Sequence, residues 1–339
     1  MNRHFLACAA LCALAGSAQA QSGVNIYGVI DTNVGWGGGS VSDNKQVGTG
    51  GLMGSRLGFR GTEDLGDGLK ANFAIEHGLN SDTGTQASPA PGLFWNRLAY
   101  VGLGTRFGDV NLGRQYTPTF LVHATYDAFG PQGVAAQQVL LGSMEFAQPA
   151  SIRAANSVSY LTPNTLGGFA LTAMTSANEG SPTGGKYTGL SLTWQGGGLS
   201  TTAAFARYYN PAIDDLDAFT VGARYKFGAF TLYGLYDRAN SGNGPDSHGV
   251  QVSGLYTIGV LDLKASIARS VLKSAGGVEI GSTQRTGVGF VYNLSKRTAL
   301  YGQYAHLANS HGAAAAVNGA VTGPNEGANG ADLGIRHAF

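Results

Sequence analysis

The chain has 339 residues, of which only 12% are charged and 43% are hydrophobic, and it contains 54 glycines. The charged share is about half that of a typical soluble domain. Mean hydropathy is nevertheless near zero, so the apolar residues are not gathered into bilayer-spanning blocks. This composition excludes a helical membrane protein. A formal net charge of +1 and the lack of any basic run argue against a nucleic-acid partner.

The first 20 residues have the pattern of a secretion signal. Arg3 precedes an apolar run over residues 5–16, and small residues at 17–20 provide a cleavage site. The run is too short to cross a bilayer as a helix, which takes ~20 residues. We predict a signal peptide over residues 1–20 and one domain over 21–339. Both cysteines lie in the signal, so the exported domain uses no disulfide.

Polar and apolar residues alternate with period two in many segments. In residues 69–79 the odd positions are mostly apolar, whereas Lys70 and Glu76 occupy even ones. Residues 55–61 and 261–267 alternate in the same way. This periodicity predicts strands with one apolar and one polar face. A soluble β-sandwich shows the same pattern in any one strand, so alternation alone leaves both classes open.

The connections between the candidate strands distinguish a barrel from a soluble β-sandwich better than the strands themselves do. Long and short connections alternate along the chain, with eight long and seven short, as in an up-and-down barrel elaborated at one end only. We predict sixteen strands, which begin near Val24, Ser55, Gly68, Trp95, Gly108, Asn156, Phe169, Lys186, Leu199, Asp217, Phe230, Ser247, Leu261, Thr283, Thr298 and Gly330.

A membrane explains both the alternation and the asymmetry. Spanning strands take ~9 to 11 tilted residues, and the 319 residues left after removal of the signal give about 20 per strand with its connection. In hydrocarbon only a closed sheet pairs every backbone polar group. The sequence therefore predicts an all-β fold, a 16-stranded antiparallel transmembrane β-barrel. Aromatics near strand ends suit interfacial girdles, although each alone is also an ordinary packed aromatic: Trp36, Trp95, Trp194, Tyr225, Phe227, Tyr292 and Phe339.

Several segments carry a family resemblance. They are VNIYGVID (24–31), GSRLGFRGTEDLGDG (54–68), RLAYVGL (97–103), VNLGRQY (110–116), YNLSKRT (292–298) and the terminal LGIRHAF. In this order they resemble the general porins of β-proteobacterial outer membranes.

The resemblance implies an outer-membrane porin, a water-filled channel for passive diffusion of ions and small hydrophilic solutes. It implies a homotrimer in which a long third outer loop folds into each pore. Phe339 would be the residue that the barrel assembly machinery recognises. Outer-membrane lipid and lipopolysaccharide would surround the barrel, and neither a cofactor nor a metal is implied.

The connection over residues 117–155 is the longest in the chain. Unstructured loops of this length in compact proteins are usually functional, and barrels of this strand number are too wide for side chains to fill. We therefore predict that this constriction loop lies inside the barrel, with a short helix over Val134 to Met144. An exposed surface loop is the alternative.

Charged side chains near the loop are the candidate site residues. Strand parity places Arg56 and Arg60 in the lumen. The resemblance carries Arg56, Arg97 and Arg153 onto the basic wall of the pore, and Arg114 is a looser candidate. Rings of fixed charge set ion selectivity in narrow channels. The alternative is that each arginine is simply a solvated lumen residue.

Arg97 departs from strict alternation because it shares the parity of the apolar residue Ala99. Either a bulge or break near Trp95 turns Arg97 inward, or Arg97 belongs to a rim or subunit contact. Facing the cations we place Asp127 and Glu145 from the loop. More cations than anions predicts a mild preference for anions.

An enzyme and an adhesin are the other classes considered. The sequence has no H-E-x-x-H zinc motif and no G-x-S-x-G elbow, so we predict no catalytic function and no metal. Acidic residues at 63–67 precede Gly68, and Asp-Gly favours a turn over a calcium site. The Ala-, Gly- and Asn-rich segment 312–330 is predicted to be mobile, and adhesion or phage attachment is a possible second use of the outer loops.

Overall fold

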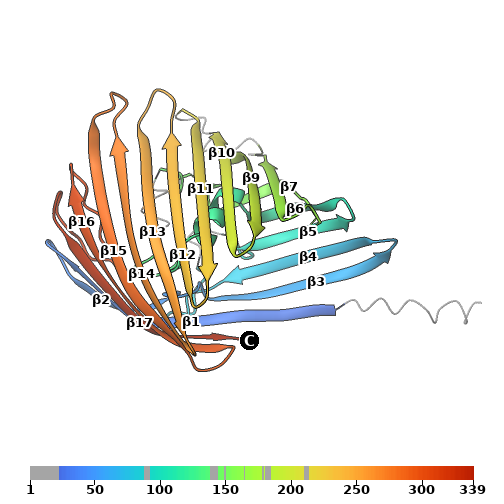
Figure 1. Cartoon of the computed structure of the whole chain (residues 1–339), viewed down its shortest axis with the longest axis horizontal. Helices are drawn as coiled ribbons and strands as arrows, with labels where there is room; N and C mark the ends of the chain where they lie inside the picture. The colour runs from blue at the N-terminus through green and yellow to red at the C-terminus, as the bar shows by residue number, and fades with distance from the viewer. Residues whose placement is uncertain are drawn as a thin grey trace, which may run out of the picture.

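The computed structural model describes residues 23–87, 92–137, 144–148, 150–163, 165–177, 179, 185–209 and 214–339. Its strands form one antiparallel sheet that closes into a barrel (Figure 1). The strands are β1 Gly23–Gly39, β2 Asn44–Thr49, β3 Arg56–Gly66, β4 Leu69–Gly78, β5 Leu98–Thr105, β6 Gly108–Tyr116, β7 Arg153–Leu161, β8 Phe169–Ser176, β9 Lys186–Gly196, β10 Leu199–Tyr209, β11 Leu216–Phe227, β12 Phe230–Asn240, β13 Asp246–Ile258, β14 Leu261–Lys273, β15 Glu279–Asn293, β16 Thr298–Ser310 and β17 Ala328–Ala338.

The barrel closes between the first and last strands, which lie side by side in Figure 1. Their register runs from Val29 opposite Ala338 to Gly39 opposite Ala328. Gly28 and Phe339 extend the seam, because each backbone N–H donates to the other's carbonyl, at 3.2 and 3.1 Å. Closure satisfies the edges that hydrocarbon would otherwise leave unpaired.

The predicted fold class is confirmed, with one additional short strand. All sixteen predicted strands are present and begin within a few residues of their expected positions. The sequence predicts that residues 37–54 are the first long outer connection. Instead, strand β2 lies within this segment and pairs with β1 over Thr32–Gly37. The other half of β1, Gly23–Val29, pairs with β3. Strand β1 therefore pairs on one edge with two strands, β3 along its first part and β2 along its second part.

The strands are apolar outside and polar inside, the reverse of a soluble sheet. In β13, Val250 and Val252 are each 53% exposed, whereas Gln251 and Ser253 are 3% and 2% exposed. Alternation of this kind is expected where lipid contacts one face and the lumen lies on the other. The period-two pattern in the sequence therefore indicates which side chains face lipid and which face the lumen, as well as the presence of a strand.

The connection between β6 and β7 contains the helix α2, Pro118–Thr125. Thr117 caps it by accepting a hydrogen bond from the Phe120 backbone N–H, and proline occupies the first turn, where its missing N–H costs nothing. The helix predicted over 134–144 is wrong for residues 134–137, and 138–143 lie outside the described residues. No helix in the described part of the chain is long and apolar enough to cross a membrane.

The constriction loop lies inside the barrel, which contradicts the exposed alternative. The Tyr126 hydroxyl is 2.8 Å from Ser200 Oγ on β10. Farther along, the Ala128 N–H donates to Ser253 Oγ on β13 at 3.0 Å. The Val134 N–H donates to Asp332 on β17, also at 3.0 Å. The loop therefore crosses the lumen from one wall to another, bonded to inward-facing strand side chains.

Two smaller predictions have different outcomes. Asp67 and Gly68 both have positive φ, 51° and 78°, as a tight turn requires. Segment 312–330 was expected to be mobile, but it is tied to the first hairpin. The Asn318 amide donates to the Trp36 carbonyl at 3.1 Å, and Ser42 and Val321 form a β-bridge. The asparagine side chains of this segment form hydrogen bonds that hold it in place, which the low hydrophobicity of the segment did not predict.

The lipid-facing assignment predicts a position-specific stability effect. Val252→Arg should lower the free energy of unfolding by about 2 to 4 kcal/mol, because arginine on the lipid face near the bilayer centre is costly. The measurement is urea unfolding in lipid bilayers, with Val252→Leu as a matched control that should change little. Equal stability of the arginine variant and the wild type would contradict the assignment of this face.

Candidate functional site

A cavity of about 530 Å³ lies between the constriction loop and the barrel wall. Five cationic side chains and two carboxylates are among the residues that line it. These charged residues are Arg56, Arg97, Arg153, Lys264 and Arg336, with Asp127 and Asp262. Three of the arginines predicted for the pore wall are therefore brought together here.

Tyr116 and Glu76 hold the arginines in place. Arg97 donates to Glu76 Oε1 at 2.5 Å and to the Tyr116 hydroxyl at 2.5 Å. Arg153 donates to the same hydroxyl at 2.8 Å, and its guanidinium carbon lies 4.4 Å from the ring centroid of Tyr116. Arg56 is 3.9 Å from the other oxygen of Glu76. One carboxylate and one phenol thus organise three cations, whose mutual repulsion would otherwise separate them.

Arg97 faces the lumen because it precedes its strand. β5 begins at Leu98, and the Arg97 N–H donates to the Glu76 carbonyl at 3.1 Å. From there Val101 and Leu103 are exposed on the lipid face, as the alternation predicts. Gly78 provides room, since a Cβ there would lie 2.9 Å from Arg97 Cδ. The break expected near Trp95 is therefore present, and the alternative of a rim contact is wrong.

Asp127 lines the cavity from the loop side. Its carboxylate accepts hydrogen bonds from the backbone N–H groups of Phe129 and Gln137, both at 2.9 Å. Burial raises the pKa of Asp127, and these two bonds act in the opposite direction. The side chain organises the turn of the loop and presents little unpaired charge to the cavity.

Arg60 and Arg114 are not brought into this cavity. Arg60 lines a separate one, nearer the end with short connections, together with Lys70 and Asp109. Its guanidinium carbon lies 5.0 Å from the ring centroid of Tyr27. Arg114 donates through Nε to the Asn96 carbonyl at 2.9 Å and lines neither cavity.

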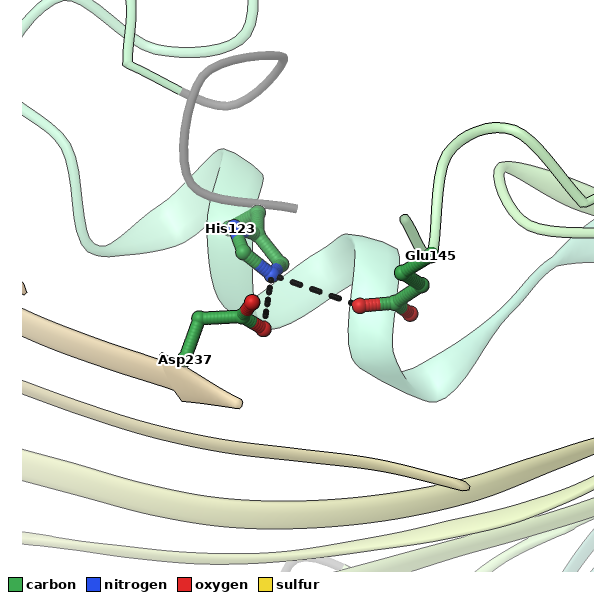
Figure 2. Close-up of side chains that lie close together, drawn as sticks. All are labelled: His123, Glu145 and Asp237. Atoms are coloured by element: carbon green, nitrogen blue, oxygen red, sulfur yellow. Dashed lines mark hydrogen bonds and ion pairs between the residues drawn. The ribbon is translucent and has the colours of Figure 1, made fainter. Parts of the chain in front are cut away.

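Glu145 does not face the arginines, which corrects the expectation. It is completely buried between the loop and the wall, where Tyr208 on β10 donates to its Oε1 at 2.5 Å. Its Oε2 lies 3.6 Å from His123 Nε2, which is also 3.2 Å from Asp237 Oδ2 on β12 (Figure 2). Glu145 is held at the wall by its contacts with Tyr208 and His123.

The His123 imidazole is charged in this arrangement. Burial lowers its pKa, but the hydrogen bonds and charges of Asp237 and Glu145 outweigh burial and raise the pKa to about 9. This cluster fastens the constriction loop to the barrel wall. It is separate from the arginines around Tyr116.

Sequence reasoning missed several residues of the site. Lys264 and Glu76 were on the polar faces of their strands, so alternation already pointed them to the lumen. Arg336 follows the lipid-facing Ile335 and has the inward parity as well. Tyr116 carried no such signal, because its role depends on two arginines from distant segments.

Comparisons with known proteins agree with this geometry. A family model described as Gram-negative porin matches residues 7–312. Outer membrane porin protein 32 of Delftia acidovorans is 34% identical over 363 residues that cover all of both chains. An outer membrane porin of Bordetella pertussis is 31% identical over 82% of this chain and 71% of its own.

Among solved structures, an anion-selective porin from Comamonas acidovorans superposes with a TM-score of 0.83 at 33% identity. It covers 94% of this chain and 100% of its own. OmpT of Vibrio cholerae, at 17% identity and a TM-score of 0.71, covers 95% of this chain and 99% of its own, and shares the fold. The closed barrel, the loop within it and these relatives lead to one conclusion: the chain belongs to the Gram-negative porin family and is a channel of the outer membrane.

Proposed function

We propose that this porin has a mild preference for anions and conducts them and small hydrophilic solutes by passive diffusion. The observation that carries the proposal is the charge of the constriction, where five cationic side chains and two carboxylates line one cavity. Asp127, one of those carboxylates, is already bonded by two backbone N–H groups. The unbalanced charge is positive.

The position of the cations supports the proposal. Arg97 and Arg153 also line a second, smaller cavity together with residues of the outer connections. Arg60 and Lys70 continue the basic lining toward the short turns. Fixed charges beside a narrow, low-dielectric passage act strongly on passing ions. A solved relative at 33% identity is described as anion-selective.

Assembly and export are part of the same proposal. Residues 1–20, outside the described part of the chain, act as a signal peptide, and Phe339 at the barrel seam serves as the assembly signal. The mature porin is a homotrimer in contact with outer-membrane lipid and lipopolysaccharide. OmpT of Vibrio cholerae, which shares the fold, has been solved in a trimer form. The matching relatives are porins, which are channels rather than enzymes, and the proposal includes no catalytic step.

Removing a constriction arginine should weaken the anion preference. One unit charge ~8 Å from an ion contributes about 0.5 to 1 kcal/mol at an effective dielectric constant of about 40 to 80. The shifts for an anion and a cation have opposite signs, which doubles their difference, and screening by salt roughly halves it. Arg153→Ala or Arg56→Ala should therefore lower the anion-to-cation permeability ratio roughly two- to sixfold. The measurement is the reversal potential across a salt gradient in planar bilayers. Arg106→Ala, in the exposed turn after β5, is the matched control and should change little.

A wild-type channel that strongly favours cations would rule out the basic-constriction proposal. A sealed bilayer despite inserted protein would favour an adhesin or a barrel enzyme.

Neutralising Glu76 should act in the opposite direction. Glu76→Gln keeps a hydrogen-bond acceptor for Arg97 but removes the carboxylate that pairs it at 2.5 Å. The anion-to-cation permeability ratio should rise by the same roughly two- to sixfold factor, since the site gains one net positive charge. Reversal potentials that move toward cations would show that Glu76 maintains the arginines' position rather than offsetting their charge.

The trimer has its own test. Light scattering in detergent should give three chains per particle, and single-channel records should show closures in groups of three. A monomeric particle with single-step closures would contradict the trimer while leaving the channel proposal intact.

A further inference from the structure

His123, Glu145 and Asp237 come from three separate elements and point toward one another (Figure 2). His123 lies on helix α2, Glu145 follows later in the constriction loop, and Asp237 is on strand β12 of the wall. Each is at most 1% exposed. One histidine and two carboxylates offer their ligand atoms within 4.8 Å of one another.

Two of the three separations are close to those of zinc ligands. A tetrahedral zinc with bonds of about 2.0 to 2.2 Å holds its ligand atoms about 3.3 to 3.6 Å apart. His123 Nε2 is 3.2 Å from Asp237 Oδ2 and 3.6 Å from Glu145 Oε2.

The hydrogen bonds around the cluster leave ligand atoms free. Tyr208 donates to Glu145 Oε1 at 2.5 Å, and Thr220 donates to Asp237 Oδ2 at 3.0 Å. Glu145 Oε2 and Asp237 Oδ1 are buried without a hydrogen-bond partner. Tyr208 and Thr220 thus orient the two carboxylates and leave Glu145 Oε2 and Asp237 Oδ1 available, as hydrogen-bond partners around metal ligands do.

The charge of the cluster also favours a cation. With both carboxylates ionised, the cluster is net negative whether or not the imidazole carries a proton. Within the described part of the chain, His123 is the sole basic side chain in an ion pair with Glu145 or Asp237. A buried net charge is costly. A divalent ion together with a neutral imidazole brings the total to zero.

We propose that His123, Glu145 and Asp237 form a zinc site that clamps the constriction loop to the barrel wall. The ligands are His123 Nε2, Glu145 Oε2 and the Asp237 carboxylate, whose Oδ1 is unpartnered and whose Oδ2 already accepts a hydrogen bond from Thr220. Zinc is the choice over magnesium or calcium, because an imidazole nitrogen suits a transition ion and the hard cations prefer oxygen alone. On binding, the Nε2 proton of a charged His123 passes to water as the nitrogen becomes a ligand.

The test measures bound metal on the whole folded porin. Protein refolded in metal-free buffer is equilibrated with micromolar Zn²⁺, passed through a desalting column and analysed by inductively coupled plasma mass spectrometry. We expect one zinc per wild-type chain and no retained magnesium in a parallel sample. His123→Gln and Asp237→Asn should each lose the zinc. Anomalous scattering at the zinc edge from wild-type crystals should place the ion between the three side chains.

A matched control addresses adventitious binding. His311, an exposed residue that follows β16, has its Nδ1 3.2 Å from Oε1 of Glu279, the first residue of β15. His311→Gln should retain the zinc. Loss of zinc in His311→Gln, equal zinc in His123→Gln and wild type, or no zinc at all would overturn the proposal. Because the anomalous measurement uses only wild-type protein, a variant that fails to fold does not prevent the decision.

Discussion

The structure depends on one constraint, that no backbone N–H or C=O can remain unpaired in hydrocarbon. The pairing of β1 with β17 meets this constraint for the whole sheet. Sixteen wall strands then enclose a lumen too wide for their own side chains to fill. Closure therefore creates the problem that the constriction loop solves, because a barrel without the loop would have no core and a wider passage between its charged side chains.

The loop takes the place of a hydrophobic core, and polar contacts with the wall accompany its apolar packing. Tyr126, Ala128 and Val134 are bonded to Ser200, Ser253 and Asp332 on three different strands. Buried polar groups must find partners, so lumen serines and aspartates that would destabilise a soluble core become attachment points here. The inward-facing polar side chains of the strands thus hold the loop in position as well as contacting water in the lumen.

The alternation within a strand predicted those side-chain orientations that depend on the residues of that strand alone. Parity placed Arg56 in the lumen, and the same rule accounts for Lys264, because each strand's lipid face is fixed by its own residues. Parity did not predict that Glu145 turns to the wall, since that depends on His123 and Tyr208, which are distant in sequence. Strand β2 was missed for a similar reason, because its pairing with β1 over Thr32–Gly37 depends on how β1 is divided between β2 and β3.

The position of the arginines explains why selectivity is expected to be mild. Glu76 lies within 2.5 Å of Arg97 and 3.9 Å of Arg56, so part of their charge is offset at its source. Tyr116 carries no charge but fixes Arg97 and Arg153 through one hydroxyl. A carboxylate that holds arginines in place also reduces their field. At this constriction, the carboxylate that fixes the arginines also lowers the net positive charge. The cations that act most strongly on passing ions are therefore those, such as Arg153, that are held by the neutral phenol of Tyr116.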